Sequence, residues 1–272
     1  MTFASLPSWL LTAYALILGL CVGSFLNVVV ARLPHGKSLV RPPSACPQCG
    51  RNIRWYENIP VLSFLALRGR CRGCRTAISV RYPVIELLVG MLFLATAARF
   101  GWSWLLVLRD WPFVALLVAI SFIDLEHRII PDSLSLSGLV IGLATAWAVP
   151  GLGEMNALLG AALGFGAFYL LSYLYQRFTG RMGLGGGDVK LLAMIGAFVG
   201  PSGVFLTIFI SSISGSLIGI GWALSQSRGK PGVGPRAALM TVAIPYGPFL
   251  VLGALYAYLL GDLTWFQFTT PM

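Results

Sequence analysis

The chain is organised around Gly183-Leu184-Gly185-Gly186-Gly187-Asp188-Val189-Lys190, a glycine run that delivers one carboxylate to the start of an apolar segment. An acid beside a membrane span is energetically costly, so by default it marks a functional site. The glycines let the backbone adopt conformations that other residues avoid. Because Asp is also a favoured residue at helix starts, the role of Asp188 depends on whether the chain supplies a partner for it.

The composition is that of an integral membrane protein. The chain is 57% hydrophobic and only 10% charged, whereas soluble domains carry about 25% charged residues. Apolar runs long enough to cross a bilayer recur, and helices are the only spanning elements that fit them. We therefore predict an all-α polytopic membrane protein with about eight transmembrane helices, near residues 9–30, 82–98, 102–124, 134–149, 157–175, 188–199, 202–224 and 238–260.

The basic residues indicate an orientation and not a nucleic-acid partner. Ten of the 19 Lys and Arg residues lie within residues 31–83, between the first two spans. By the positive-inside rule this loop is cytoplasmic and the N-terminus lies outside. The first eight residues contain no Lys or Arg, so we expect the first span to remain in the mature protein. The predicted parts are a transmembrane helix at 1–32, a cytoplasmic loop at 33–82 and a seven-helix membrane domain at 83–272.

The apolar segment that follows Asp188 is short. It counts only 12 residues before Gly200-Pro201, a length of about 18 Å against a hydrocarbon core of about 30 Å. We expect Asp188 to lie in a recess lined by the glycine run, because irregular backbone at membrane depth is tolerated only where it lines protein or a cavity. Arg109 and Asp110 are expected to neutralise each other, and Cys21 is expected to be buried.

A second carboxylate, Asp124, closes the span at 102–124 on the same side of the membrane as Asp188. Pro131 ends that helix, and Asp132 is predicted to cap the next one. Two carboxylates that share a water and a proton perform aspartic proteolysis. Intramembrane acids also form ion or proton sites in transporters, and the two acids alone do not decide between these functions.

Four cysteines predict a metal site in the cytoplasmic loop. They form two Cys-x-x-Cys pairs separated by 21 residues: Cys46, Cys49, Cys71 and Cys74. In a reducing compartment this spacing favours zinc over disulfides and over free or redox thiols. Four thiolates leave no open coordination position, so the predicted zinc is structural and folds a loop too polar to build a core.

Several motifs resemble the type IV prepilin leader peptidases, the bacterial enzymes that process pilins and type II secretion pseudopilins. The matching residues run in order along nearly the whole chain: Gly23 to Val28, Cys46 to Gly50, Asn58 to Pro60, Arg68 to Cys74, Ser79 to Pro83, Asp124 to Asp132, Gly185 to Leu191, and Ile244 to Phe249. The Gly-x-Gly-Asp pattern is also similar to that of presenilin-like proteases.

The resemblance implies that Asp124 and Asp188 are the catalytic pair of an inner-membrane aspartic endopeptidase. Its substrates would be prepilins and pseudopilins anchored in the lipid membrane. Their short basic leader is cut after a Gly at the cytoplasmic face. The resemblance also implies N-methylation of the new N-terminal residue with S-adenosylmethionine. Glu86 and Asn27 are candidates for binding that cofactor or for gripping the substrate N-terminus, although a purely structural Asn27–Glu86 or Glu86–Arg bond is favoured over either role. A transporter or assembly factor with a zinc-stabilised docking loop is the alternative function.

The positions of the acids lead to a hypothesis about their shared proton. Asp188 lies at a helix N-terminus, where the helix dipole favours an anion. Asp124 lies at a helix C-terminus behind Phe122 and Ile123, where dipole and desolvation both disfavour one. The sequence therefore predicts that the proton resides mainly on Asp124 and that Asp188 is the base.

Overall fold

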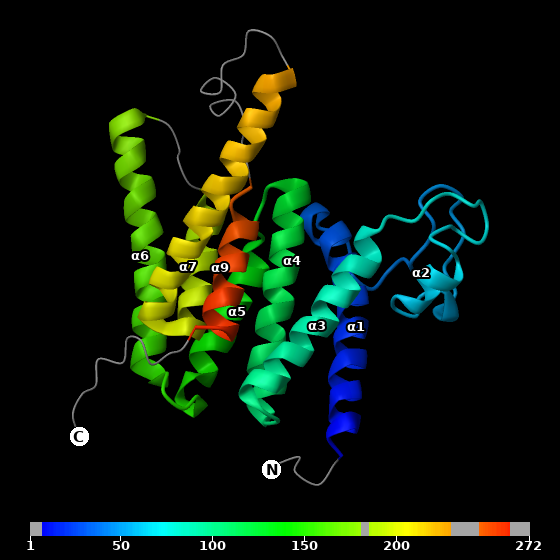
Figure 1. Ribbon diagram of the computed structural model, residues 1–272, viewed down its shortest axis with the longest axis horizontal. Helices are drawn as coiled ribbons and strands as arrows, with labels where there is room; N and C mark the ends of the chain where they lie inside the picture. Colours follow the sequence, from blue (N-terminus) through cyan, green and yellow to red (C-terminus); the bar gives the residue numbers. More distant parts are fainter. Residues whose placement is uncertain (1–6, 181–184, 230–244, 262–272) are drawn as a thin grey trace. The chain divides into compact units, whose positions relative to one another are not determined.

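The computed structural model describes residues 7–180, 185–229 and 245–261. The chain divides into two compact units, Met1–Ile123 and Asp124–Met272. Within the described ranges the regular elements are helices (Figure 1), and the β-structure consists of two isolated bridges. The predicted all-α class is confirmed.

In the first unit, two long helices pack against each other and cross at an angle (Figure 1). They are α1 (Ser8–Arg32) and α3 (Arg81–Phe100). A Cβ added to Gly23 of α1 would lie 2.6 Å from the Cα of Glu86 of α3, so only glycine permits this approach. Small residues at helix contacts are the usual means of close packing in lipid, where there is no hydrophobic drive between helices. This contact holds Glu86 directly beside α1.

The loop between these helices contains three short helical turns, η1 (Leu33–His35), η2 (Trp55–Glu57) and α2 (Leu62–Ala66). After α3, a π-helical turn, η3 (Leu106–Asp110), leads into α4 (Trp111–His127). Such turns are rare and interrupt the regular helix geometry.

Arg109 and Asp110 are buried in the π-helical turn and form an ion pair, with Nε and Oδ1 3.9 Å apart. The predicted mutual neutralisation is confirmed. Cys21, in contrast, is exposed, so the expected burial is wrong. A small apolar side chain in lipid gains little from moving between the lipid face and the helix interface.

In the second unit, α7 (Gly186–Gly229) packs against α5 (Asp132–Thr145), α6 (Gly153–Thr179) and α9 (Gly247–Leu259) (Figure 1). Its first half is buried on nearly every side, from Val189 to Val199. A helix that is apolar all round is expected in such a central position. Because Asp188 directly precedes this rigid core, its backbone is firmly anchored on one side.

Helix α7 breaks at Gly200, where φ is 69° and ψ is −178°. Pro201 follows, and the sequence placed a boundary at this point. The two halves correspond to the predicted segments at 188–199 and 202–224. Gly160 and Gly196 meet backbone to backbone between α6 and α7, as expected for closely packed helices.

Among the described residues, five helices are long and apolar enough to cross a membrane: Ser8–His35, Arg81–Phe100, Leu106–His127, Gly153–Thr179 and Gly186–Trp222. The protein is therefore a multi-pass membrane protein. Two further apolar helices, Asp132–Ala148 and Gly247–Leu259, are shorter, and at 1.5 Å per residue neither reaches the full thickness of about 30 Å. The count of eight spans stays a prediction. The expected start of the last span, at 238–244, lies outside the described residues.

Candidate functional site

Asp124 lies near the C-terminal end of α4 and is 6% exposed. Its Oδ2 accepts a hydrogen bond from the backbone N–H of Gly247, at 2.9 Å. Gly247 is the first residue of α9, where backbone N–H groups have no partner within the helix. The N-terminus of one helix therefore fixes the carboxylate presented by another.

Only glycine fits at position 247. A Cβ there would lie 2.6 Å from Oδ2 of Asp124 and 3.1 Å from its Cγ, well inside van der Waals contact. The sequence motif around Gly247 signalled the resemblance, but its role as a donor to Asp124 was not predicted. Ile244, which belongs to the same motif, lies outside the described residues.

Asp188 lies in the first turn of α7 and is half-buried. Its backbone N–H donates to the carbonyl oxygen of Gly185, at 3.1 Å. The carboxylates of Asp124 and Asp188 are near enough to interact electrostatically. The structure therefore brings the two predicted acids together. Gly183 and Leu184, at the start of the glycine run, lie outside the described residues.

Two more contacts tie the segment after α4 to the start of α7. A Cβ on Gly187 would lie 2.7 Å from the Cβ of Ile130, so these segments pack tightly. Lys190 Nζ donates to Asp132 Oδ2 at 2.6 Å. The prediction that Asp132 caps α5 is wrong, because its position in that helix is the first turn and no side-chain capping bond forms. Its carboxylate pairs with Lys190 instead.

The N–H of Gly247 also bears on the hypothesis about the shared proton. That hypothesis counted the dipole of the helix carrying each aspartate and the apolar residues before Asp124. It omitted the backbone N–H that α9 donates to Asp124. Such a hydrogen bond stabilises the ionised form of the carboxylate that accepts it. The location of the shared proton stays a prediction, and it depends on the donor from α9 as well as on the helix that carries Asp124.

The four cysteines of the loop form one cluster. The Sγ atoms of Cys46, Cys49, Cys71 and Cys74 all lie within 4.8 Å of one another, and those of Cys46 and Cys74 are 3.8 Å apart. A tetrahedral site with Zn–S bonds of about 2.3 Å has S···S edges of about 3.8 Å. The cluster therefore fits a tetrahedral metal ion with four thiolate ligands.

The two Cys-x-x-Cys pairs have the same backbone geometry. Cys46 N–H donates to Arg51 O at 2.9 Å, and Cys71 N–H donates to Thr76 O at 2.8 Å. Each cysteine turn contains one residue with positive φ four positions after its first cysteine, Gly50 at 68° and Arg75 at 60°. This repeated turn aims two sulfurs from each pair at a common centre.

Local hydrogen bonds favour the thiolate form at two of the cysteines. Bonds with the side chain and backbone of Thr76 lower the pKa of Cys74 to about 6. Backbone N–H groups of Cys49 and Gln48 lower the pKa of Cys46. Since the thiolate is the form that binds metals, these contacts favour metal binding at Cys46 and Cys74. At Cys49, in contrast, the hydrogen bond with the Cys46 side chain raises the pKa to about 11.

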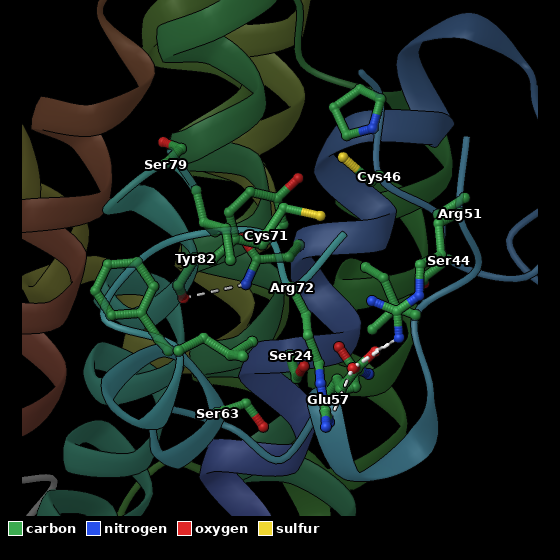
Figure 2. A pocket seen from close by; sticks show the side chains of 18 of the residues that line it. Ser24, Ser44, Cys46, Arg51, Glu57, Ser63, Cys71, Arg72, Ser79 and Tyr82 are labelled. Atoms are coloured by element: carbon green, nitrogen blue, oxygen red, sulfur yellow. Dashed lines mark hydrogen bonds and ion pairs between the residues drawn. The ribbon is translucent and has the colours of Figure 1, made fainter. Parts of the chain in front are cut away.

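A cavity of about 480 Å³ lies in the first unit, between the cysteine loop, α1 and α3. Figure 2 shows Arg51 and Arg72 approaching Glu57 at this cavity. Arg51 donates to both carboxylate oxygens, at 2.8 and 3.0 Å, and Arg72 lies 3.5 Å from Oε1. The hydrogen bond from Arg51 lowers the pKa of Glu57, so the charge of this carboxylate is already balanced by an arginine.

The two residues predicted from the sequence as binding candidates, Asn27 and Glu86, line the same cavity. Asn27 is 3% exposed and Glu86 is 7% exposed. Glu86 Oε2 accepts the N–H of Val61 at 2.7 Å. The expected Asn27–Glu86 bond and Glu86–Arg pair do not form within the described residues.

Two family models match the chain. The Bacterial Peptidase A24 N-terminal domain matches residues 17–100, and the Type IV leader peptidase family matches residues 111–220. No solved structure is significantly similar to the chain.

Curated relatives resemble most of the chain. A prepilin leader peptidase/N-methyltransferase of Myxococcus xanthus is 47% identical over 85% of this chain and 70% of its own length. Proteins of the same name are 38% identical in Pseudomonas putida, over 94% and 92% of the two chains, and 37% identical in Pseudomonas aeruginosa, over 91% and 89%. The chain belongs to the type IV leader peptidase family.

Proposed function

We propose that this protein is a membrane aspartic endopeptidase that removes the leader of type IV prepilins and pseudopilins, and that it N-methylates the new N-terminus. The observation that carries the peptidase proposal is the electrostatic proximity of Asp124 and Asp188 at the ends of two helices, with Asp124 held by Gly247. The names of the curated relatives support both activities.

The two carboxylates have complementary tasks in the proposed reaction. The ionised aspartate removes a proton from a water molecule, and the water oxygen attacks the scissile carbonyl carbon. The protonated aspartate donates its proton to the carbonyl oxygen. Collapse of the tetrahedral adduct breaks the C–N bond. The leaving amine nitrogen takes up the proton that the first aspartate removed from the water, and a hydroxyl proton of the adduct returns to the second aspartate. The pair is thereby restored to its starting state, with one proton shared between the two carboxylates.

The chemistry is proposed to take place at the cytoplasmic face of the bacterial inner membrane. The concentration of basic residues within 31–83 supports a cytoplasmic loop, and basic leaders are retained on that side by the same rule. A zinc ion held by Cys46, Cys49, Cys71 and Cys74 would stabilise this loop without taking part in hydrolysis, because four thiolates complete its coordination.

Reconstituted wild-type protein tests this proposal directly. We expect it to cut a purified prepilin after the Gly of its leader, and mass spectrometry of the new N-terminus to show one added methyl group when S-adenosylmethionine is supplied. A purified protein that leaves the prepilin intact but moves ions across vesicle membranes would support the transporter function instead. Absence of cleavage and absence of methylation are separate results, so the two activities are judged independently.

A further inference from the structure

The cavity of the first unit contains two hydrogen-bond acceptors in fixed positions. Asn27 Nδ2 donates to the carbonyl oxygens of Gly23 and Tyr82, both at 3.2 Å. Since carbonyl oxygens only accept, these two bonds determine which end of the amide is Oδ1. Oδ1 is buried and has no hydrogen-bond partner among the described residues. A buried acceptor without a donor is costly unless a bound group supplies one.

Glu86 is the second acceptor. Its side chain is bonded to Val61 N–H and to Ser24, and no ion pair of Glu86 occurs in the part of the chain that the structure describes. Glu57, the other acid of the cavity, is already neutralised by Arg51. A buried carboxylate without a partner cation is unfavourable, so Glu86 is suited to a positively charged ligand.

The backbone that orients Glu86 is strained. Val61 has φ 61° and ψ −49°, and Leu62 N–H donates to Pro60 O at 2.6 Å. This three-residue turn with positive φ is rare, and a β-branched residue in that region is an outlier. Strain of this kind persists where the surroundings enforce it, and it occurs often at functional sites. Here it aims the N–H of Val61 at Glu86.

We propose that this cavity is the methyl-transfer site and that Glu86 and Asn27 bind the α-amino group that receives the methyl. The inference rests on the proposed methyltransferase activity. An α-ammonium group offers three N–H donors and one positive charge, which match a carboxylate and an unpaired amide oxygen. The volume of about 480 Å³ also accommodates a small-molecule methyl donor.

Glu86 has a chemical task at this position. The α-amino group is largely protonated near neutral pH, with an ordinary pKa of about 7.7–8.0, and only the neutral amine is nucleophilic. A proton passes from the ammonium nitrogen to Glu86, and the amine lone pair forms a bond to the methyl carbon of the sulfonium donor. The C–S bond breaks and its electron pair passes to sulfur, which leaves a thioether. S-adenosylmethionine supplies the activated methyl group in this reaction.

Glu86→Gln tests the assignment because it keeps the shape and removes the base and its charge. A peptide that begins with the processed N-terminal Phe serves as methyl acceptor, so that cleavage is not required. Binding of S-adenosylhomocysteine, measured by calorimetry, follows the donor side independently. Glu154→Gln is the matched control, since it removes one acidic charge from an exposed position in the other unit.

We expect Glu86→Gln to lower kcat/KM for the acceptor peptide by about 10²-fold, with S-adenosylhomocysteine binding, metal content and prepilin cleavage unchanged. Glu86→Asp, which keeps the carboxylate, should restore part of the rate and the wild-type shape of the pH profile. If Glu86→Gln does not fold, Glu86→Asp and the pH dependence of its acceptor KM decide the question.

Three results would overturn the assignment. Normal methylation by Glu86→Gln would exclude a role for this carboxylate. Loss of S-adenosylhomocysteine binding with an unchanged acceptor KM would place Glu86 at the donor. Parallel loss of metal and of cleavage would make its role structural. Wild-type protein that fails to methylate the peptide would instead refute the proposed activity itself.

Discussion

Of the two adjacent glycines before Asp188, only Gly187 should be sensitive to substitution by alanine. A Cβ on Gly187 would lie 2.7 Å from the Cβ of Ile130, whereas carbon atoms pack at about 3.5–4.0 Å. Relief of this clash requires a shift of about 1 Å, and such overpacking costs about 1–3 kcal/mol. A Cβ on Gly186 meets no atom of the described residues within 4 Å.

The displaced backbone directly precedes Asp188, so the clash is expected to appear in catalysis. A misplacement of about 1 Å at a reacting group costs about 10²-fold in rate. We therefore expect Gly187→Ala to lower kcat for prepilin cleavage by about 10- to 100-fold. Gly186→Ala should stay within about twofold of wild type, as for substitutions of about 0.5 kcal/mol or less.

The assay is cleavage of a purified prepilin by each variant in the same lipid, with thermal unfolding measured in parallel. Equal rates for Gly187→Ala and Gly186→Ala would refute the argument that Ile130 fixes the approach to Asp188. A loss in Gly186→Ala alone would contradict the packing on which it is built.

Three further predictions concern the donor to Asp124 and the cysteine loop. Gly247→Ala should disrupt the hydrogen bond to the Asp124 carboxylate, which is worth about 1.5–3 kcal/mol, and lower the cleavage kcat about 10- to 100-fold. Methylation of a pre-cleaved peptide should be unchanged, and cleavage by this variant at the wild-type rate would contradict the prediction. Arg75→Gly should place glycine at the positive-φ position equivalent to that of Gly50 in the other cysteine turn and remove about 1 kcal/mol of backbone strain. We expect this variant to release its metal to a chelator more slowly than wild type, and faster release would contradict the prediction. Complete chelation should expose residues 33–82 to proteolysis while the helical circular dichroism persists, and added zinc should reverse it; unchanged resistance would argue against a structural metal.

The sequence was sufficient where the determinants are local. The spacing of the cysteines predicted one cluster, and four sulfurs within 4.8 Å of one another bear this out. Gly200 and Pro201 predicted the break in α7, because a glycine can adopt the positive φ found there. The ends of two apolar segments placed Asp124 and Asp188 on one side of the membrane, and the electrostatic interaction between them agrees with that placement.

Contacts between distant segments were not predictable by the same reasoning. Capping preference assigned Asp132 to its own helix, but Lys190, 58 residues away, takes its carboxylate. The donor to Asp124 lies 123 residues away, in Gly247. Local propensities contain no information about such partners, which depend on how the helices pack. The lipid exposure of Cys21 was missed because apolar periodicity does not separate lipid-facing from buried positions in a membrane helix.

The central claim is that Asp124 and Asp188 act as one catalytic pair. Single-turnover cleavage of a prepilin by Asp124→Asn, Asp188→Asn and the double variant tests it most directly. We predict that each single variant loses about 10³-fold or more, and that the double variant is no slower than the slower single variant, because residues that act as a unit are not additive. Each variant should still bind metal and methylate a pre-cleaved peptide. Cleavage within tenfold of wild type by either single variant would contradict the account.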